Sequence, residues 1–187
     1  MFKKGFNRLA MIMLMAVLPI AFASCSDNED EPQLPQPEVE GMLVNYSAQI
    51  DSAMLKYFDV TVEYTSFDGQ TVTVPLNGKQ WTQAVAFVRE KGEMPSDLDV
   101  ALKIAKKQSP EFEGKSVRID GRVDLVSSMV YTDGTVTYLT HGLKTEKSTI
   151  AVDKLDDYID SKNGVIVHYE VSGITYDENG EVVSPIL

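Results

Sequence analysis

The sequence predicts a mainly β protein, and two observations support this fold class. Apolar and polar residues alternate in many short segments after residue 42, which is the two-residue period of a half-buried strand. Asp-Gly or Asn-Gly pairs separate several of these segments and favour tight turns, because both residues tolerate positive φ; they lie at 68–69, 77–78, 133–134 and 179–180. Short strands joined in this way are typical of an antiparallel β-sandwich. We expect an immunoglobulin-like sandwich with one short helix near residues 152–161.

Residues 1–24 have the layout of a secretory signal. A short basic region holds Lys3, Lys4 and Arg8, and an apolar run follows from Leu9 to Phe22. A helix that spans a membrane needs about 20 apolar residues, and this run is shorter. We therefore expect the segment to direct export and to be removed.

Cys25 follows Phe22-Ala23-Ser24 and is the only cysteine, so it has no partner for an internal disulfide. The two small residues before it resemble the lipobox of bacterial lipoproteins, although Phe22 stands where Leu is usual. The resemblance implies lipidation of Cys25 and attachment to the membrane by several acyl chains, which hold a protein far more firmly than one chain. The alternatives are an ordinary secretory signal with an incidental cysteine, or a membrane-anchoring helix.

Residues 25–41 are expected to form a tether. Ser26 to Glu31 hold four acids among six residues. This run resembles the export signal that sends Bacteroidota lipoproteins to the outer face of the outer membrane, although acidic runs are also common in plain solvated tethers. The three prolines of residues 32–41 favour a semi-rigid spacer. We therefore expect an outer-membrane protein whose domain, residues 42–187, faces the cell exterior.

The alternation predicts strands in the first half of this domain at 44–50, 58–65, 72–76 and 81–87. Residues 96–107 allow two interpretations. Ser96, Asp99 and the lysines at the end of the segment resemble helix caps and charges that complement a helix dipole. The apolar residues from Leu98 to Ile104 alternate strictly, however, and would be spread around a helix axis. We therefore favour a strand.

In the second half, the alternation predicts strands at 117–125, 129–131, 136–139 and 165–171, with a bend at Ser127-Ser128 and a closing hairpin over 174–183. The polar segment from His141 to Ser148 is expected to be a loop. Apolar residues at helical spacing predict the short helix, which Asn163-Gly164 should end in the left-handed conformation; they are Val152, Leu155, Tyr158 and Ile159.

Several segments resemble small, uncharacterised Bacteroidota surface lipoproteins with a β-sandwich domain. They are Tyr46 to Ile50, Asp59 to Tyr64, Asp68-Gly69-Gln70, the lone Trp81 that opens a strand, Pro95 before an apolar strand, and the late short helix. The resemblance covers nearly the whole domain. It implies a sandwich and a role in the cell envelope, and it implies no reaction.

The charge of the chain argues against some partners. Residues 1–24 hold three of the 17 basic residues and none of the 28 acidic ones, so the rest of the chain has a formal net charge of −14, from 14 basic and 28 acidic residues. Nucleic acids and anionic lipid surfaces attract basic proteins. We therefore expect no nucleic-acid partner, and contact with the membrane only through the N-terminal lipid.

Exposed aromatic rings can stack on sugars. Trp81, Tyr131 and Tyr138 are the candidates for such a platform, with Tyr169 as a further one. The alternative, which we favour, is that Trp81 packs between the two sheets, as single tryptophans in sandwiches usually do.

Asp51-Ser52-Ala53 resembles the short O-glycosylation motif that Bacteroidota use on exported proteins. The resemblance makes Ser52 a candidate modification site. Three-residue patterns also arise by chance, and a modified Ser52 would have to be exposed.

The sequence points to no catalytic residue, metal site or cofactor. His141 falls in the expected polar loop, and His168 falls in a strand on the face expected to include Ile166 and Glu170, with no nucleophile elbow beside them. The acidic segment 177–181 lacks the distant bidentate Glu of a calcium loop. The aspartates of the predicted helix have no histidine among them that would suggest a transition metal.

These observations favour a lipid-anchored, surface-facing sandwich that acts as a non-catalytic binding or structural module. A glycan or an outer-membrane protein is the expected partner, and an edge strand could also accept a strand from another chain. The alternative is a cell-envelope hydrolase that uses a pair of carboxylates, which in glycosidases lie about 5–10 Å apart. With 28 acidic residues in the chain, such a pair is available.

Overall fold

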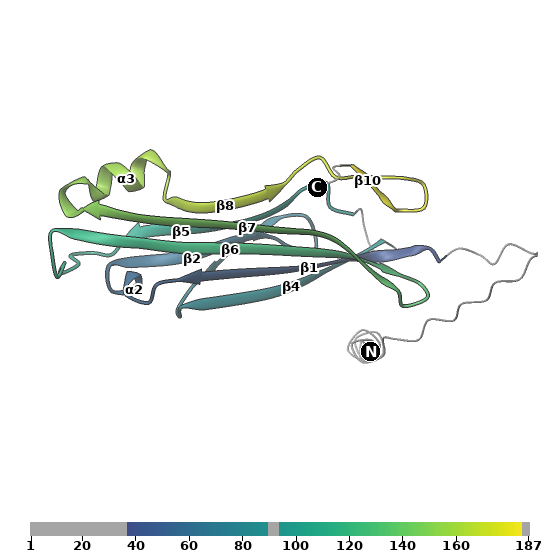
Figure 1. The fold of residues 1–187 in the computed structure, drawn as a ribbon, viewed down its shortest axis with the longest axis horizontal. Coiled ribbons are helices and arrows are strands. Elements are labelled where there is room, and N and C mark those ends of the chain that lie inside the picture. The colour runs from purple at the N-terminus through teal and green to yellow at the C-terminus, as the bar shows by residue number, and fades with distance from the viewer. Residues whose placement is uncertain (1–36, 90–93, 185–187) are drawn as a thin grey trace, which may run out of the picture. The chain divides into compact units, whose positions relative to one another are not determined.

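The computed structural model describes residues 37–89 and 94–184. Within these residues, two four-stranded antiparallel sheets form a mainly β sandwich, which confirms the predicted fold class (Figure 1). The two packed sheets make a sandwich. The finer prediction of an immunoglobulin-like arrangement is not confirmed. The predicted signal, Cys25 and the acidic run lie outside the described residues.

The first sheet has the strand order β4-β1-β6-β7. Its strands are β1 (Val39–Ile50), β4 (Gln80–Val88), β6 (Ser116–Tyr131) and β7 (Val136–Ala151). β6 and β7 form a long hairpin, closed at Asp133-Gly134, where Gly134 has φ of +85°. β1 begins three residues before the expected start of the domain at residue 42, because Val39 packs into the core and is only 3% exposed.

The second sheet has the strand order β3-β2-β5-β8. Its strands are β2 (Phe58–Thr65), β3 (Thr71–Pro75), β5 (Leu98–Lys106) and β8 (Val165–Val171). β5 resolves the ambiguous segment 96–107 as a strand. Its apolar side chains point into the core on alternate positions, and β2 and β8 pair with it on either side.

The helical elements and the last hairpin complete the described chain. The predicted helix is confirmed as a 3₁₀ turn η3 (Val152–Lys154) followed by α3 (Leu155–Ser161), and Asn163 and Gly164 take φ of +50° and +76° after it. A further single turn, α2 (Met54–Tyr57), was not predicted. β9 (Thr175–Tyr176) and β10 (Val182–Ser184) form the expected closing hairpin.

The core lies between the two sheets, because both bury one face. Its largest fully buried side chains come from both sheets and from the short helices, and include Tyr46, Phe58, Leu102, Leu125 and Leu155. The opposite face of each sheet is therefore free to carry polar side chains.

One predicted loop is wrong. Residues 141–148 continue β7 and pair with residues 119–126 of β6. The expected bend at Ser127-Ser128 is a shift of register within this hairpin, and β6 runs through it without a break.

Candidate functional site

The outer face of the first sheet holds a hollow lined by polar and apolar residues. Ser47 lies between Thr82 and Asp124 in the register, and Asn45 lies between Ala84 and Val126. Directly paired residues project to the same side of a sheet. These side chains therefore surround one place on the surface, where the hollow has a volume of about 270 Å³ and Gln83 also lines it.

Asp124 is the charged group of this hollow, and its side chain is only 17% exposed. Its Oδ2 accepts a hydrogen bond of 3.2 Å from the guanidinium of Arg122. Its Oδ1 is buried and lies 2.8 Å from Nε2 of His141, but no hydrogen bond of acceptable geometry reaches it. Buried carboxylate oxygens are normally hydrogen-bonded, and the imidazole of His141 is the polar group beside this one.

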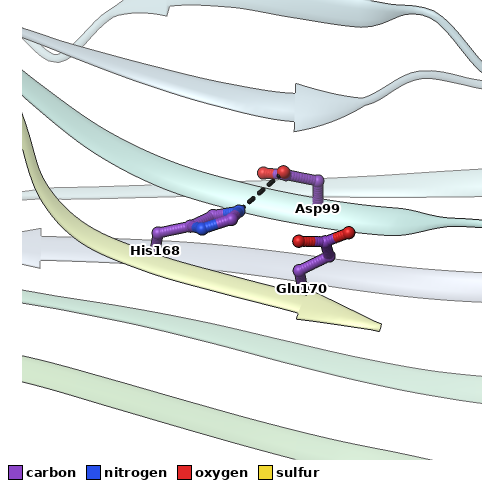
Figure 2. A group of neighbouring side chains, drawn as sticks. All are labelled: Asp99, His168 and Glu170. Carbon is purple, nitrogen blue, oxygen red and sulfur yellow. Dashed lines mark hydrogen bonds and ion pairs between the residues drawn. The ribbon is translucent and has the colours of Figure 1, made fainter. Parts of the chain in front are cut away.

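The outer face of the second sheet brings together a histidine and two carboxylates. Asp99 of β5 lies directly opposite Glu170 of β8, and His168 projects from the same side of β8 (Figure 2). Nε2 of His168 lies 2.7 Å from Oδ2 of Asp99, and one ligand atom from each of the three residues lies within 4.8 Å of the others. We call these three side chains the Asp99 triad.

A β-bulge in β8 produces this arrangement. Leu102 pairs with Val167 and Lys103 pairs with Val165, so Ile166 is an extra residue without a partner. Ile166 and Val167 are both buried as a result, and the alternation after them is reversed. The expectation that Ile166 shares a face with His168 is therefore wrong, because simple alternation does not hold across a bulge.

The sequence alone does not reveal the triad, because its members are far apart along the chain: Asp99 and His168 are separated by 69 positions. His141 was also misplaced, since it lies on β7 and not in a loop. The pairing of strands alone brings each histidine to its aspartate.

The candidate stacking residues Trp81 and Tyr131 lie far apart along the first sheet. Trp81 pairs with Ala48, which faces the core, and its ring lies 5.1 Å from the ring of Tyr64. Trp81 is partly buried and packs against the core. The favoured interpretation, that it packs between the two sheets, is confirmed to this extent. Tyr131 pairs with Val39 of β1, whereas Trp81 pairs with Ala48 of the same strand. These two positions are nine residues apart, which is about 30 Å along a strand.

The two tyrosines of the platform have different surroundings. The hydroxyl of Tyr131 donates a 2.9 Å hydrogen bond to Glu181. Burial is the larger cause and this hydrogen bond the second cause that raise the pKa of Tyr131. Tyr138 is 58% exposed and lies opposite Ser128, whose side of β6 is the outer face of the first sheet. Tyr138 therefore stays available to a ligand on that face.

Ser52 is exposed in the turn between β1 and α2. The backbone N–H of Ala53 donates a 2.9 Å hydrogen bond to Oδ1 of Asp51, which closes this turn. The hydroxyl thus meets the condition of exposure that modification requires.

No protein-family model matches the chain, and comparisons with curated proteins and with solved structures find no match either. Among the described residues, no helix is both long and apolar enough to cross a membrane.

Proposed function

We propose that this chain is a lipid-anchored, cell-surface binding module that holds glycans on the outer face of its first sheet, without catalysis. The observation that carries the proposal is the hollow beside Asp124, which combines polar groups with the apolar surface of Tyr46, Ala84 and Val126. A carboxylate, amides and hydroxyls from three neighbouring strands line it. Sugars present many hydroxyl groups, each of which both donates and accepts, so a lining of this composition suits them.

Two exposed apolar side chains of β7 lie on the same face of the sheet, outside the hollow. Leu143 of β7 pairs with Asp124 and is 46% exposed, and Tyr138 lies further along the same strand. An exposed ring beside polar groups can cover the apolar face of a sugar while the carboxylate accepts hydrogen bonds from its hydroxyls. The expected lipid on Cys25 precedes β1 in the chain and would hold the domain at the cell surface.

The test is binding of the full chain, purified in detergent, to a panel of immobilised neutral and acidic polysaccharides. We expect at least one polysaccharide to be bound, and Asp124→Asn to weaken that binding about tenfold or more. A hydrogen bond to a charged group contributes about 1.5–3 kcal/mol, and 1.4 kcal/mol corresponds to a factor of ten. The matched control is Asp153→Asn, at an exposed aspartate of η3, which should bind as the wild type does. Failure of every polysaccharide to bind, or equal binding by Asp124→Asn, would contradict the proposal.

The alternative is a cell-envelope hydrolase, and the observation that favours it is the pair formed by Asp99 and Glu170. Their carboxylate oxygens lie within 4.8 Å of each other, close to the carboxyl separation of about 5 Å in retaining glycosidases. The polysaccharide panel separates the two functions, because a hydrolase would release new reducing ends from a bound polysaccharide and a binding module would not.

A further inference from the structure

We infer that the Asp99 triad is a binding site for a divalent transition-metal ion, with Zn²⁺ as the best match. The triad offers one imidazole nitrogen and two carboxylate oxygens. Zinc is often bound by three protein ligands of these types, with a fourth position left open to water or to another donor. Imidazole also favours zinc over magnesium and calcium, which prefer oxygen ligands alone.

The distances within the triad suit such an ion after small side-chain rotations. Ligand atoms around a tetrahedral zinc ion, with bonds of about 2.0–2.2 Å, lie about 3.3 Å from one another. His168 and Asp99 would separate slightly from their 2.7 Å contact, and Glu170 would approach within the present limit of 4.8 Å. The ion would take the place of the direct contact between the histidine and the aspartate.

The backbone beneath the triad is well supported. Asp99 and Glu170 are paired residues, and His168 pairs with Ala101, which is 4% exposed. The N–H of Asp99 donates a 2.9 Å hydrogen bond to Oγ1 of Thr65 on β2. Ligands on paired strands are held more precisely than ligands on loops, so little order has to be gained on binding.

The nearby cation on the same sheet has a different partner. Lys103 lies two residues from Ala101 along β5, and its Nζ is 2.8 Å from the carboxylate of Glu63. The carboxylates of the triad are therefore not neutralised by this lysine. The side chains of Asp99 and His168 are 34% and 42% exposed, which leaves a path for an ion to enter from solvent.

A second histidine–aspartate pair in the chain provides an internal comparison for the Asp99 triad. His141 and Asp124 on the first sheet form a second histidine–aspartate pair, with a contact of 2.8 Å. There the neighbouring group is the guanidinium of Arg122, 3.2 Å from Asp124, and not a second carboxylate. A positive charge disfavours a cation and supplies no ligand, so we expect metal at the Asp99 triad and none at the second pair.

The experiment is a calorimetric titration of the full chain, purified in detergent and stripped of metal with EDTA, with zinc chloride. We expect one zinc ion per chain at the triad. His168→Ala and Glu170→Gln should each weaken its binding at least about tenfold. His141→Ala should leave zinc affinity unchanged, and an excess of magnesium should not displace the zinc. Glu170→Gln preserves the size of the side chain, so the variant separates loss of a ligand from loss of fold, and circular dichroism checks the fold of all three variants.

Absence of zinc binding by the wild type would overturn the inference. So would binding that survives His168→Ala, which would place the ion elsewhere, for example on Cys25. An equal loss in His141→Ala and His168→Ala would also overturn it, because it would show that a histidine–aspartate pair is sufficient and the triad is not a built site. Metal binding at the triad needs nothing from the hollow on the first sheet, so either proposal can fail while the other stands.

Discussion

At the scale of single residues, Gly142 is a position where a side chain has no room. A Cβ atom built on Gly142 of β7 would lie 1.7 Å from Cζ of Tyr169 on β8. The tyrosine ring therefore packs directly on the backbone of the opposite sheet. This contact also explains why Tyr169 is not free to join a stacking platform.

We expect Gly142→Ala to destabilise the protein by about 1–3 kcal/mol or more, because the added methyl group would displace a packed aromatic ring. Gly78→Ala is the matched control, since nothing lies within 4 Å of a Cβ at that position. A change at such a surface site should stay within about 0.5 kcal/mol. Urea denaturation of both variants measures the difference, and equal free energies of unfolding would show that the Tyr169 contact adapts without cost.

At the scale of elements, β7 explains why a strand can resemble a loop in the sequence. Its inward positions over residues 142–148 are Gly142, Lys144, Glu146 and Ser148, which pair with the inward residues of β6. No apolar residue marks the buried side there. The carboxylate of Glu146 instead accepts hydrogen bonds from Ser148 and from Tyr158 of α3. The hydrogen bond from Ser148 and the positive charge of Lys162 lower the pKa of Glu146.

The outer positions of this part of β7 are also mostly polar, because β7 is an edge strand of its sheet. Charged side chains such as Lys147 hinder the addition of another strand to an exposed edge. Charged residues on an edge strand interrupt the alternation of apolar and polar residues that marks a half-buried strand. A periodicity argument therefore cannot distinguish this segment from a solvated loop.

Hydrogen exchange tests the strand assignment of residues 141–148. The amides that donate to β6 should exchange slowly, and those that point away from the sheet should exchange fast, so protection should alternate along the segment. Residues 111–115, which lie outside any strand or helix, provide the unprotected reference. Uniformly fast exchange over 141–148 would mean that the segment is a loop in solution.

At the scale of the whole molecule, the sandwich presents two outer faces with different chemistry. The first sheet carries a hollow with a carboxylate, amides and hydroxyls, and the second sheet carries the Asp99 triad. Both faces would be accessible on a domain held away from a membrane by an N-terminal tether. The direction in which the domain faces decides which ligands it meets.

Protease shaving of intact cells tests the predicted anchor and orientation. We expect the domain to be cleaved while a periplasmic control protein survives, because the acidic run after Cys25 is expected to direct export to the outer face. Cys25→Ala should lack the lipid and leave the membrane fraction, since acyl chains supply the attachment. Resistance of the domain until the outer membrane is broken would show that it faces the periplasm, and membrane attachment of Cys25→Ala would rule out the lipid as the anchor.

The sequence by itself determined most of the elements of this protein, because alternation, turn residues and helical spacing are local properties of the chain. Asp68-Gly69, the strand of residues 58–65 and the helix that ends at Asn163-Gly164 could all be predicted from a few neighbouring residues. Only the tertiary structure decided which strands pair and in which register. The register brings His168 to Asp99 and His141 to Asp124, and the bulge at Ile166 reverses the face of β8. The candidate sites could not be predicted for this reason, since contacts between residues far apart in the chain depend on how the sheets assemble and leave no periodic mark in the sequence.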